Sequence, residues 1–207
     1  MPLFLNDEQQ MLRDTARDFM AEHAPVSHLR ALRDADDRTG FSRDLWRQFA
    51  EMGFTGILIG EDQGGLGLGH VEAGVVLEEI GRNLSPSPFL STAVAAVEAL
   101  KGTAAAERWF PGVLAGETVA ALAIDEGAKH REAVSLRAER SGNGFRLTGA
   151  KGFLTHGHVA DLLIVAARTA GGELDREGIT LFAIDGQAAG LTATPERLAD
   201  ASLASRV

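Results

Sequence analysis

The sequence predicts an α+β protein of two domains, an all-α helical domain over residues 1–116 followed by an antiparallel β-barrel-like domain over residues 117–207. Two observations predict this order. Apolar residues recur at helical spacing through the first half, whereas short apolar runs separated by Gly, Asn and Asp follow from about Gly116. With 207 residues, 45% of them apolar, the chain is long enough to form a core in each half.

The first three helices are predicted largely from their ends. Asn6 is suited to cap a helix, and Gln9 three positions later completes a capping-box pattern. A short second helix is predicted over Val26–Asp34. A third is predicted to start at Ser42 and to stop at Gly53, because a small polar residue often precedes a helix and glycine often follows one.

The fourth helix is predicted over His70–Ile80. Its apolar residues Val71, Val75 and Ile80 are expected to face inward, and Gly81 is expected to stop it. Two more helices complete this half of the chain. They are predicted over Phe89–Leu100 and, interrupted by a proline, over Glu107–Leu114.

The β-domain is predicted from alternation and turn chemistry. Val119–Ile124 is a β-like apolar run, and Ser135–Arg140 alternates. The SGNG segment at 141–144 favours a hairpin turn that pairs Phe145–Thr148 back onto it. Four further strands are expected, over Lys151–Thr155, Leu162–Arg168, Ile179–Ile184 and Leu191–Thr194.

Charge and composition exclude several classes of protein. The net charge of −9 argues against nucleic acid as a partner, although backbone donors still allow an anionic ligand. The absence of cysteine excludes disulfides and thiolate chemistry. The N-terminus lacks signal-peptide features, and no apolar run approaches the roughly 18 residues of a membrane span. A cytoplasmic location without membrane contact is therefore predicted.

A glycine-dense loop stands out in the helical half. Five glycines fall within ten residues of the segment GEDQGGLGLG, from Gly60 to Gly69. Neither a P-loop lysine nor a complete G-x-G-x-x-G element is present, so phosphate cradling has no motif to support it. The simplest interpretation is a tight, irregular connection that precedes a helix.

Four motifs in order resemble the acyl-CoA dehydrogenase family. The opening helix LNDEQQMLRDTARDFMAEH is similar to that of the family, and GEDQGGLGLG resembles its P-E-x-x-G-G-x-G loop. The segment FRLTGAKGFLTHGHVADLLIVAAR resembles L-x-G-x-K-x-[FW]-[IV]-[ST]-N-G…A-D-x-x-x-V-x-A-R, and ITLFAIDGQAAGLTATPERL follows the G-I-S-x-F-L-V…P-G-[LV] pattern. The resemblance covers nearly the whole chain.

The resemblance implies a flavoprotein oxidoreductase of fatty acid metabolism. The family uses FAD to dehydrogenate an acyl-CoA thioester between its α and β carbons, and passes electrons to an electron-transfer flavoprotein. The aromatic and hydroxyl positions near the flavin match Phe153 and Thr155. Taken alone, Phe153 is more simply explained as part of the barrel core and Thr155 as a strand-favouring residue, and the surrounding motif reverses this preference. A homo- or hetero-oligomer is also implied.

The second flavin-binding element departs from the family pattern T-E-P-x-A-G-S-D. Aligned without gaps it corresponds to Ala123–His130, so a hydroxyl is replaced by Ala123, whose backbone N–H, beside Leu122, is still able to bind cofactor. Lys129 is a candidate for contact with a substrate phosphate, and an exposed solubilising lysine is the alternative.

No residue of the chain is assigned as the catalytic base. The family carries its catalytic glutamate in a C-terminal helical domain, which this sequence lacks, so the chain is interpreted as truncated. Glu78 and Glu79 are expected to be a solvated or capping-adjacent pair, and Asp125 and Glu126 to lie in a turn. Whether the chain alone is an enzyme stays open.

Three alternatives accompany this interpretation. A non-catalytic subunit that pairs with a longer dehydrogenase would explain the altered motif and the missing base. A flavin-dependent monooxygenase on the same fold is a second alternative. A metal site at His156 and His158 with Asp161 is a third, and it is not adopted, because no third ligand stands at a firm spacing.

Overall fold

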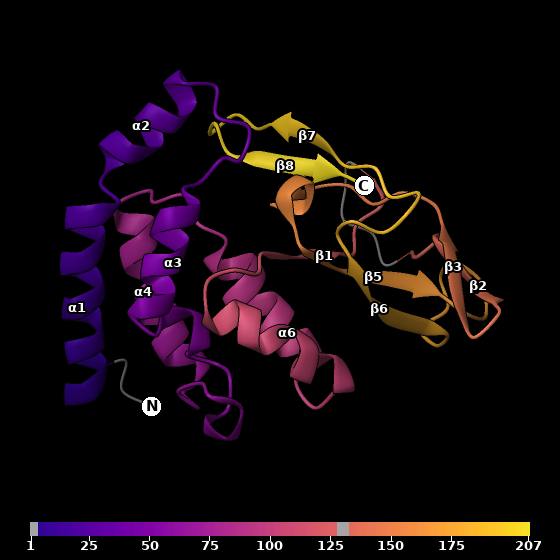
Figure 1. Ribbon diagram of the computed structural model, residues 1–207, viewed down its shortest axis with the longest axis horizontal. Coiled ribbons are helices and arrows are strands. Elements are labelled where there is room, and N and C mark those ends of the chain that lie inside the picture. The colour runs from indigo at the N-terminus through magenta and orange to yellow at the C-terminus, as the bar shows by residue number, and fades with distance from the viewer. Residues whose placement is uncertain (1–3, 128–132) are drawn as a thin grey trace. The chain divides into compact units, whose positions relative to one another are not determined.

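The computed structural model describes residues 4–127 and 133–207, and these form two compact units that meet in the sequence between Thr118 and Val119 (Figure 1). The first unit is helical and the second contains the strands, which confirms the predicted fold class. None of the helices in the described ranges is long and apolar enough to cross a membrane.

The helical unit contains six α-helices, two single-turn 3-10 helices and one π-helix among the residues described. In chain order they are α1 Asp7–His23, α2 Val26–Asp34, α3 Arg43–Glu51, η1 Phe54–Gly56, η2 Glu61–Gln63, α4 His70–Arg82, the π-helix η3 Phe89–Ala96, α5 Val97–Leu100 and α6 Ala104–Leu114. In Figure 1, α1, α3 and α4 run side by side.

The predicted ends of the first and third helices are confirmed. The Asn6 side chain accepts a hydrogen bond from the Gln9 amide at 2.8 Å, and the Gln9 side chain accepts one from the Asn6 amide at 3.1 Å. Ser42 caps α3 by accepting from the Leu45 amide. Gly53 follows α3 with a φ of 78°, a left-handed conformation that glycine adopts without steric cost.

Helix α4 does not stop at Gly81 as predicted. It runs on to Arg82, and the left-handed residue that closes it is Leu84, with a φ of 50°. The Leu84 amide donates to the Gly81 carbonyl and the Ser85 amide to the Ile80 carbonyl, which is the hydrogen-bond pattern of a Schellman motif. The glycine was therefore a misleading stop signal, because the closing position is three residues farther on.

The inward face of α4 also differs from the prediction. Its buried residues are Ala73, Val75, Val76 and Glu79, whereas Val71 lies in the first turn with 58% of its surface exposed. Val75 was predicted correctly. Glu79 was not, because a carboxylate is seldom placed in a core unless cations accompany it.

Glu79 is buried because two arginines compensate its charge. One carboxylate oxygen lies 3.0 Å from Arg17 Nη2 of α1, and the other lies 3.2 Å from Arg82 Nε of α4 itself. The hydrogen bond to Glu79 raises the pKa of Arg17 above its usual value. The pair from Arg17 to Glu79 fixes α1 against α4, whereas the preceding residue Glu78 remains exposed and bonds to Arg82.

The β-unit contains two sheets that do not close into a barrel. The larger has the order β1–β5–β2–β3, with β6 paired to β5, and the smaller has the order β4–β8–β7. The strands are β1 Ala120–Ala123, β2 Arg137–Ser141, β3 Gly144–Thr148, β4 Leu154–Thr155, β5 Leu162–Arg168, β6 Ile179–Asp185, β7 Thr194–Arg197 and β8 Leu203–Arg206. Strand β1 pairs with β5 in parallel, so the larger sheet is mixed and not purely antiparallel.

The predicted β2–β3 hairpin is confirmed, with Arg137 opposite Thr148 and Gly142 at a φ of 59° in its turn. Two of the predicted strands have different bounds in the structure. The strand expected over Lys151–Thr155 is only Leu154–Thr155, and the strand expected over Leu191–Thr194 is β7, Thr194–Arg197. Strand β8 was not predicted, because LASR has too little apolar alternation to mark it.

Arg168 at the end of β5 organises the loop that follows. Its guanidinium is buried and donates to five backbone carbonyls, those of Val134, Ala170, Glu173, Asp175 and Glu177, at 2.9 to 3.2 Å. The loop therefore wraps around a single side chain that satisfies all its hydrogen-bond donors on the backbone.

We expect Glu79→Gln to lower the free energy of unfolding by about 2–3 kcal/mol. This is somewhat below the usual cost of breaking a buried ion pair, because both arginines are half exposed and regain water. Glu78→Gln is the matched control, since Glu78 bonds to the same Arg82 from the surface, and its expected effect is under about 0.5 kcal/mol. Urea unfolding at neutral pH measures both. Equal effects of the two variants would contradict the assignment.

Candidate functional site

The glycine-dense loop binds its own backbone. The amides of Gly64, Gly65, Leu66, Gly67 and Leu68 all donate to carbonyls of residues 56–61 at 2.8 to 3.0 Å. A phosphate would need such amides to point outward and free. The loop is therefore the tight connection that the sequence predicted.

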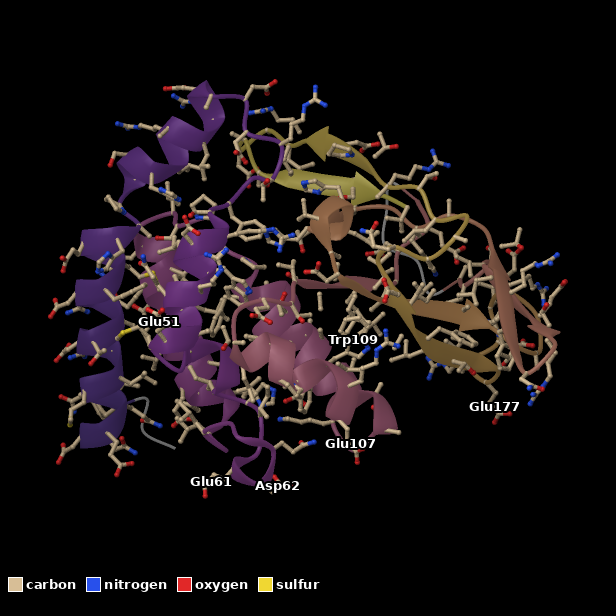
Figure 2. All side chains as sticks on the ribbon, in the orientation of Figure 1. Glu51, Glu61, Asp62, Glu107, Trp109 and Glu177 are labelled. Carbon is tan, nitrogen blue, oxygen red and sulfur yellow. The ribbon has the colours of Figure 1, made fainter. Side chains whose placement is uncertain are left out.

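The charges on the loop also oppose an anionic ligand. Glu61 and Asp62 lie at its tip, and their side chains point away from the helical unit (Figure 2). Two exposed carboxylates there would repel a phosphate.

Three of the four residues of strand β1 are fully buried, and Leu122 is the one that is partly exposed. Ala123 is fully buried and its side chain belongs to the core cluster of the β-unit, which also contains Leu154, Leu163 and Val165. Leu122 is half buried, and Ile124 just beyond the strand is 40% exposed. Side chains at 122 and 124 therefore face outward, whereas Ala123 presents only its backbone.

A β-bulge precedes β4 and re-aims Phe153. Leu154 pairs with Ser205 of β8, and the Lys151 and Val207 backbones exchange two hydrogen bonds of 2.7 and 2.9 Å. Gly152 and Phe153 thus stand opposite Arg206 alone, a two-against-one arrangement that defines a bulge. The bulge explains why the strand predicted from Lys151 begins only at Leu154, and it leaves the Phe153 side chain 52% exposed.

Two strained residues bracket β4. Phe153 has a φ of 56° and His156 a φ of 61°, in the left-handed region that bulky side chains seldom occupy. Such conformations persist where the surrounding hydrogen bonds hold them, and they occur often at functional sites. Between them, Leu154 points into the core and Thr155 is exposed. Phe153 and Thr155 therefore expose an aromatic ring and a hydroxyl two positions apart on the surface of the β-unit.

Lys151 holds this surface against the end of β1. Its ammonium is buried and donates to the Ile124 carbonyl at 2.9 Å and to Glu126 Oε1 at 2.8 Å. The Gly152 amide also donates to the Asp125 carbonyl at 2.8 Å. The segments 124–126 and 151–153 are therefore joined by three hydrogen bonds.

Glu126 completes the junction. Its carboxylate accepts from the Ser135 and Leu136 amides at 2.8 and 2.9 Å, in addition to Lys151. Burial alone would raise the pKa of Glu126, but the hydrogen bonds from Lys151 and the two amides outweigh it, so the pKa lies below its usual value. Glu126 is thus an ionised group with a structural role, beyond the turn residue that the sequence suggested.

The predicted site residues occupy different environments. Phe153 and Thr155 are exposed on one segment, Leu122 is half buried on β1, and the Ala123 side chain is inside the core. Lys129 lies outside the described residues. The sequence interpretation gave no role to Lys151 and no partner to Glu126, because they are 25 positions apart and no local pattern links them.

The Ser205 side chain holds His158 in place. The His158 amide and ring Nδ1 both lie within 2.9 Å of Ser205 Oγ, which connects the helical turn Gly157–Val159 to β8. Burial, and secondarily the nearby His158, lower the pKa of His156 from 6.5 to about 4. Within residues 4–127 and 133–207, no three His, Asp or Glu side chains are grouped to hold a metal ion.

Comparison with known proteins gives the same family for both units. Residues 6–117 match the family described as "Acyl-CoA dehydrogenase, N-terminal domain", and residues 123–204 match "Acyl-CoA dehydrogenase, middle domain". The mitochondrial isovaleryl-CoA dehydrogenase of Pongo abelii is 33% identical over 192 residues, which are 87% of this chain and 44% of that protein.

Solved structures agree on the fold. A variant of the Tcur3481-Tcur3483 steroid ACAD superposes with a TM-score of 0.84 at 32% identity, covering 97% of this chain and 54% of that one. The ChsE4-ChsE5 complex from Mycobacterium tuberculosis superposes with a TM-score of 0.86 at 24% identity, covering 100% and 54%. The chain spans about half the length of the relatives that it matches.

The low pKa of His156 predicts an acid-sensitive stability. The unfolded chain binds a proton near pH 6.5, whereas folded His156 binds it only near pH 4, so stability falls as the pH drops through this window. From pH 7 to pH 5 the expected loss is about 2 kcal/mol. His156→Asn, which tolerates the left-handed backbone, removes that part of the pH dependence.

Chemical unfolding at several pH values between 5 and 7 measures this loss. His70→Asn is the matched control for the loss of one histidine, because the His70 side chain is 69% exposed and belongs to the helical unit. Parallel stability curves for the wild type and His156→Asn would show that His156 does not carry the effect.

Proposed function

The chain belongs to the acyl-CoA dehydrogenase family, and from this premise we propose that its β-unit binds the flavin ring of FAD on the surface formed by Phe153, Thr155 and Leu122. The parent reaction is the α,β-dehydrogenation of an acyl-CoA thioester in fatty acid metabolism, with an electron-transfer flavoprotein as the acceptor. A cytoplasmic location goes with this proposal.

One observation carries the proposal. An aromatic side chain is held half exposed beside a hydroxyl by a bulge and a strained backbone, where a packed strand would have buried it. A flat aromatic cofactor stacks on such a ring, and the Thr155 hydroxyl is able to hydrogen-bond to the polar edge of a flavin. Without a ligand to cover it, an exposed phenylalanine in a strained conformation would bring no gain in stability.

The chemistry divides between cofactor and protein. FAD, when bound, supplies the acceptor for the hydride that leaves the β carbon. The residues of this chain bind and orient: Phe153 packs on a ring, Thr155 donates or accepts at its edge, and the backbone of Leu122 and Ala123 offers amides. A proton-abstracting carboxylate is not assigned among these residues.

We also propose a revised register for the altered flavin-binding element. Placing the glutamate of T-E-P on Glu126, two residues beyond the ungapped alignment, gives that glutamate a buried cationic partner in Lys151. The hydroxyl position of the pattern then falls on Asp125, and Ala123 keeps its place in the core. In this register the element retains its acid and loses its hydroxyl.

A second candidate function is favoured by the structural neighbours. The two solved structures are named for pairs of proteins, ChsE4 with ChsE5 and Tcur3481 with Tcur3483. By analogy this chain would be a subunit that pairs with a different acyl-CoA dehydrogenase chain. Co-purification with a longer flavoprotein would support this assignment, and recovery of homo-oligomers alone from the native source would contradict it.

We expect the purified chain to retain FAD through gel filtration, with flavin absorbance near roughly 370 and 450 nm. Phe153→Ala is expected to weaken FAD binding about tenfold, because stacking on an aromatic ring contributes about 1–1.5 kcal/mol. Fluorescence titration with FAD measures the affinity.

Phe145→Ala is the matched control for this substitution. Phe145 on β3 is also a partly exposed phenylalanine, but it packs on Phe182 with ring centroids 5.1 Å apart and is not among the residues proposed to contact the flavin. Its loss is expected to leave FAD affinity unchanged. A wild-type chain that neither retains FAD nor changes its fluorescence would overturn the proposal.

A further inference from the structure

We propose that Lys151 is the positioning residue of the flavin-facing surface, fixing the distance between the outward residues of β1 and those of β4. This inference rests on the proposed function. Lys151 itself has no exposed surface, so its effect on a ligand has to act through the residues that it holds.

The first step is the geometry of the junction. Phe153 follows Lys151 by two residues, and Leu122 precedes the Lys151 acceptor Ile124 by two. The ammonium therefore bridges the two segments close to the residues proposed to meet the flavin. The Gly152-to-Asp125 backbone bond adjoins this bridge, so we expect this bond to open more often when the bridge is removed.

The second step is the cost of moving the ammonium. Burying a lysine ammonium without enough hydrogen-bond acceptors costs several kcal/mol of folding free energy. The buried position of Lys151 is therefore favourable only where the ammonium reaches both the Ile124 carbonyl and the Glu126 carboxylate. Glu126 is itself held by the Ser135 and Leu136 amides, 9 and 10 residues farther along. The end of β1 therefore has one permitted position relative to the bulge.

The third step separates positioning from general stability. Arg168 is an equally buried cation in the same unit, and it also donates to backbone carbonyls. Its acceptors lie at Val134 and in the loop that follows β5, and none belongs to segments 122–126 or 151–155. Removing Arg168 is thus expected to destabilise the β-unit without changing the spacing of the proposed site.

The experiment compares Lys151→Met with Arg168→Met in the full chain. Two quantities are measured: the hydrogen-exchange rate of the Gly152 amide relative to the Ile164 amide in the middle of β5, and the affinity for FAD. Lys151→Met is expected to raise the exchange ratio roughly tenfold or more, because the local junction opens without global unfolding. It is expected to weaken FAD binding by roughly tenfold to a hundredfold, since the ring contacts lose their preset spacing.

Arg168→Met is expected to leave both the exchange ratio and FAD affinity within about twofold of the wild type. The double variant Lys151→Met with Glu126→Gln removes the unpaired carboxylate and recovers part of the lost stability. It is not expected to recover FAD affinity, because the bond to the Ile124 carbonyl is still missing. The double variant therefore separates the effect of Lys151 on stability from its effect on FAD affinity.

Each outcome decides a point. A wild-type chain that binds FAD while Lys151→Met binds it equally well overturns the positioning role and leaves the proposed function in place. A loss of FAD affinity in Arg168→Met as large as in Lys151→Met reduces Lys151 to a stabilising residue. A wild-type chain that does not bind FAD overturns the proposed function, and the inference with it.

Discussion

A primary ammonium group without exposed surface has to find its hydrogen-bond acceptors inside the protein, and Lys151 finds them at the end of β1. The carbonyl of Ile124 and the carboxylate of Glu126 supply them, and Glu126 is in turn held by the amides before β2. Much of the order of the β-unit depends on this arrangement. The pairing of Lys151 with Val207 uses the backbone of that same lysine, and the bulge at Phe153 lies two residues beyond it.

Three buried charges join distant parts of the sequence, each by a different physical solution. Glu79 is a buried anion between two half-exposed arginines, Lys151 is a buried cation with one carboxylate, and Arg168 is a buried cation surrounded by carbonyls alone. Carbonyl dipoles satisfy the donors of Arg168 without a counter-charge, which suits a loop that has to be held but not aligned. Lys151 bonds to a carboxylate and to a backbone carbonyl, so it restricts segments 124–126 and 151–153 together. Such an arrangement suits a surface on which the distance between two segments matters.

Local sequence patterns predicted the helix ends and turns that depend on contacts between residues close together in the chain. The Asn6 capping box, the helix over Val26–Asp34 and the Gly142 turn were found because each depends on residues within a few positions. Gly81 misled because a helix end is set by the residue that takes the left-handed conformation, and a leucine does so here. The parallel pairing of β1 with β5 and the bulge before β4 depend on partners far along the chain, so no local pattern reveals them.

The candidate site also combines features that a local motif predicts with features that it does not. Phe153 and Thr155 were found through a motif, but their exposure results from the strained backbone, which a sequence does not display. Binding a flavin and turning over a substrate are separable tasks, since the groups that orient a ring need not include the carboxylate that removes a proton. A chain that spans about half of its relatives is therefore suited to show what the orienting groups achieve by themselves. The proposed flavin contact makes a modest physical demand: one aromatic face, one hydroxyl and a buried lysine proposed to keep them in place.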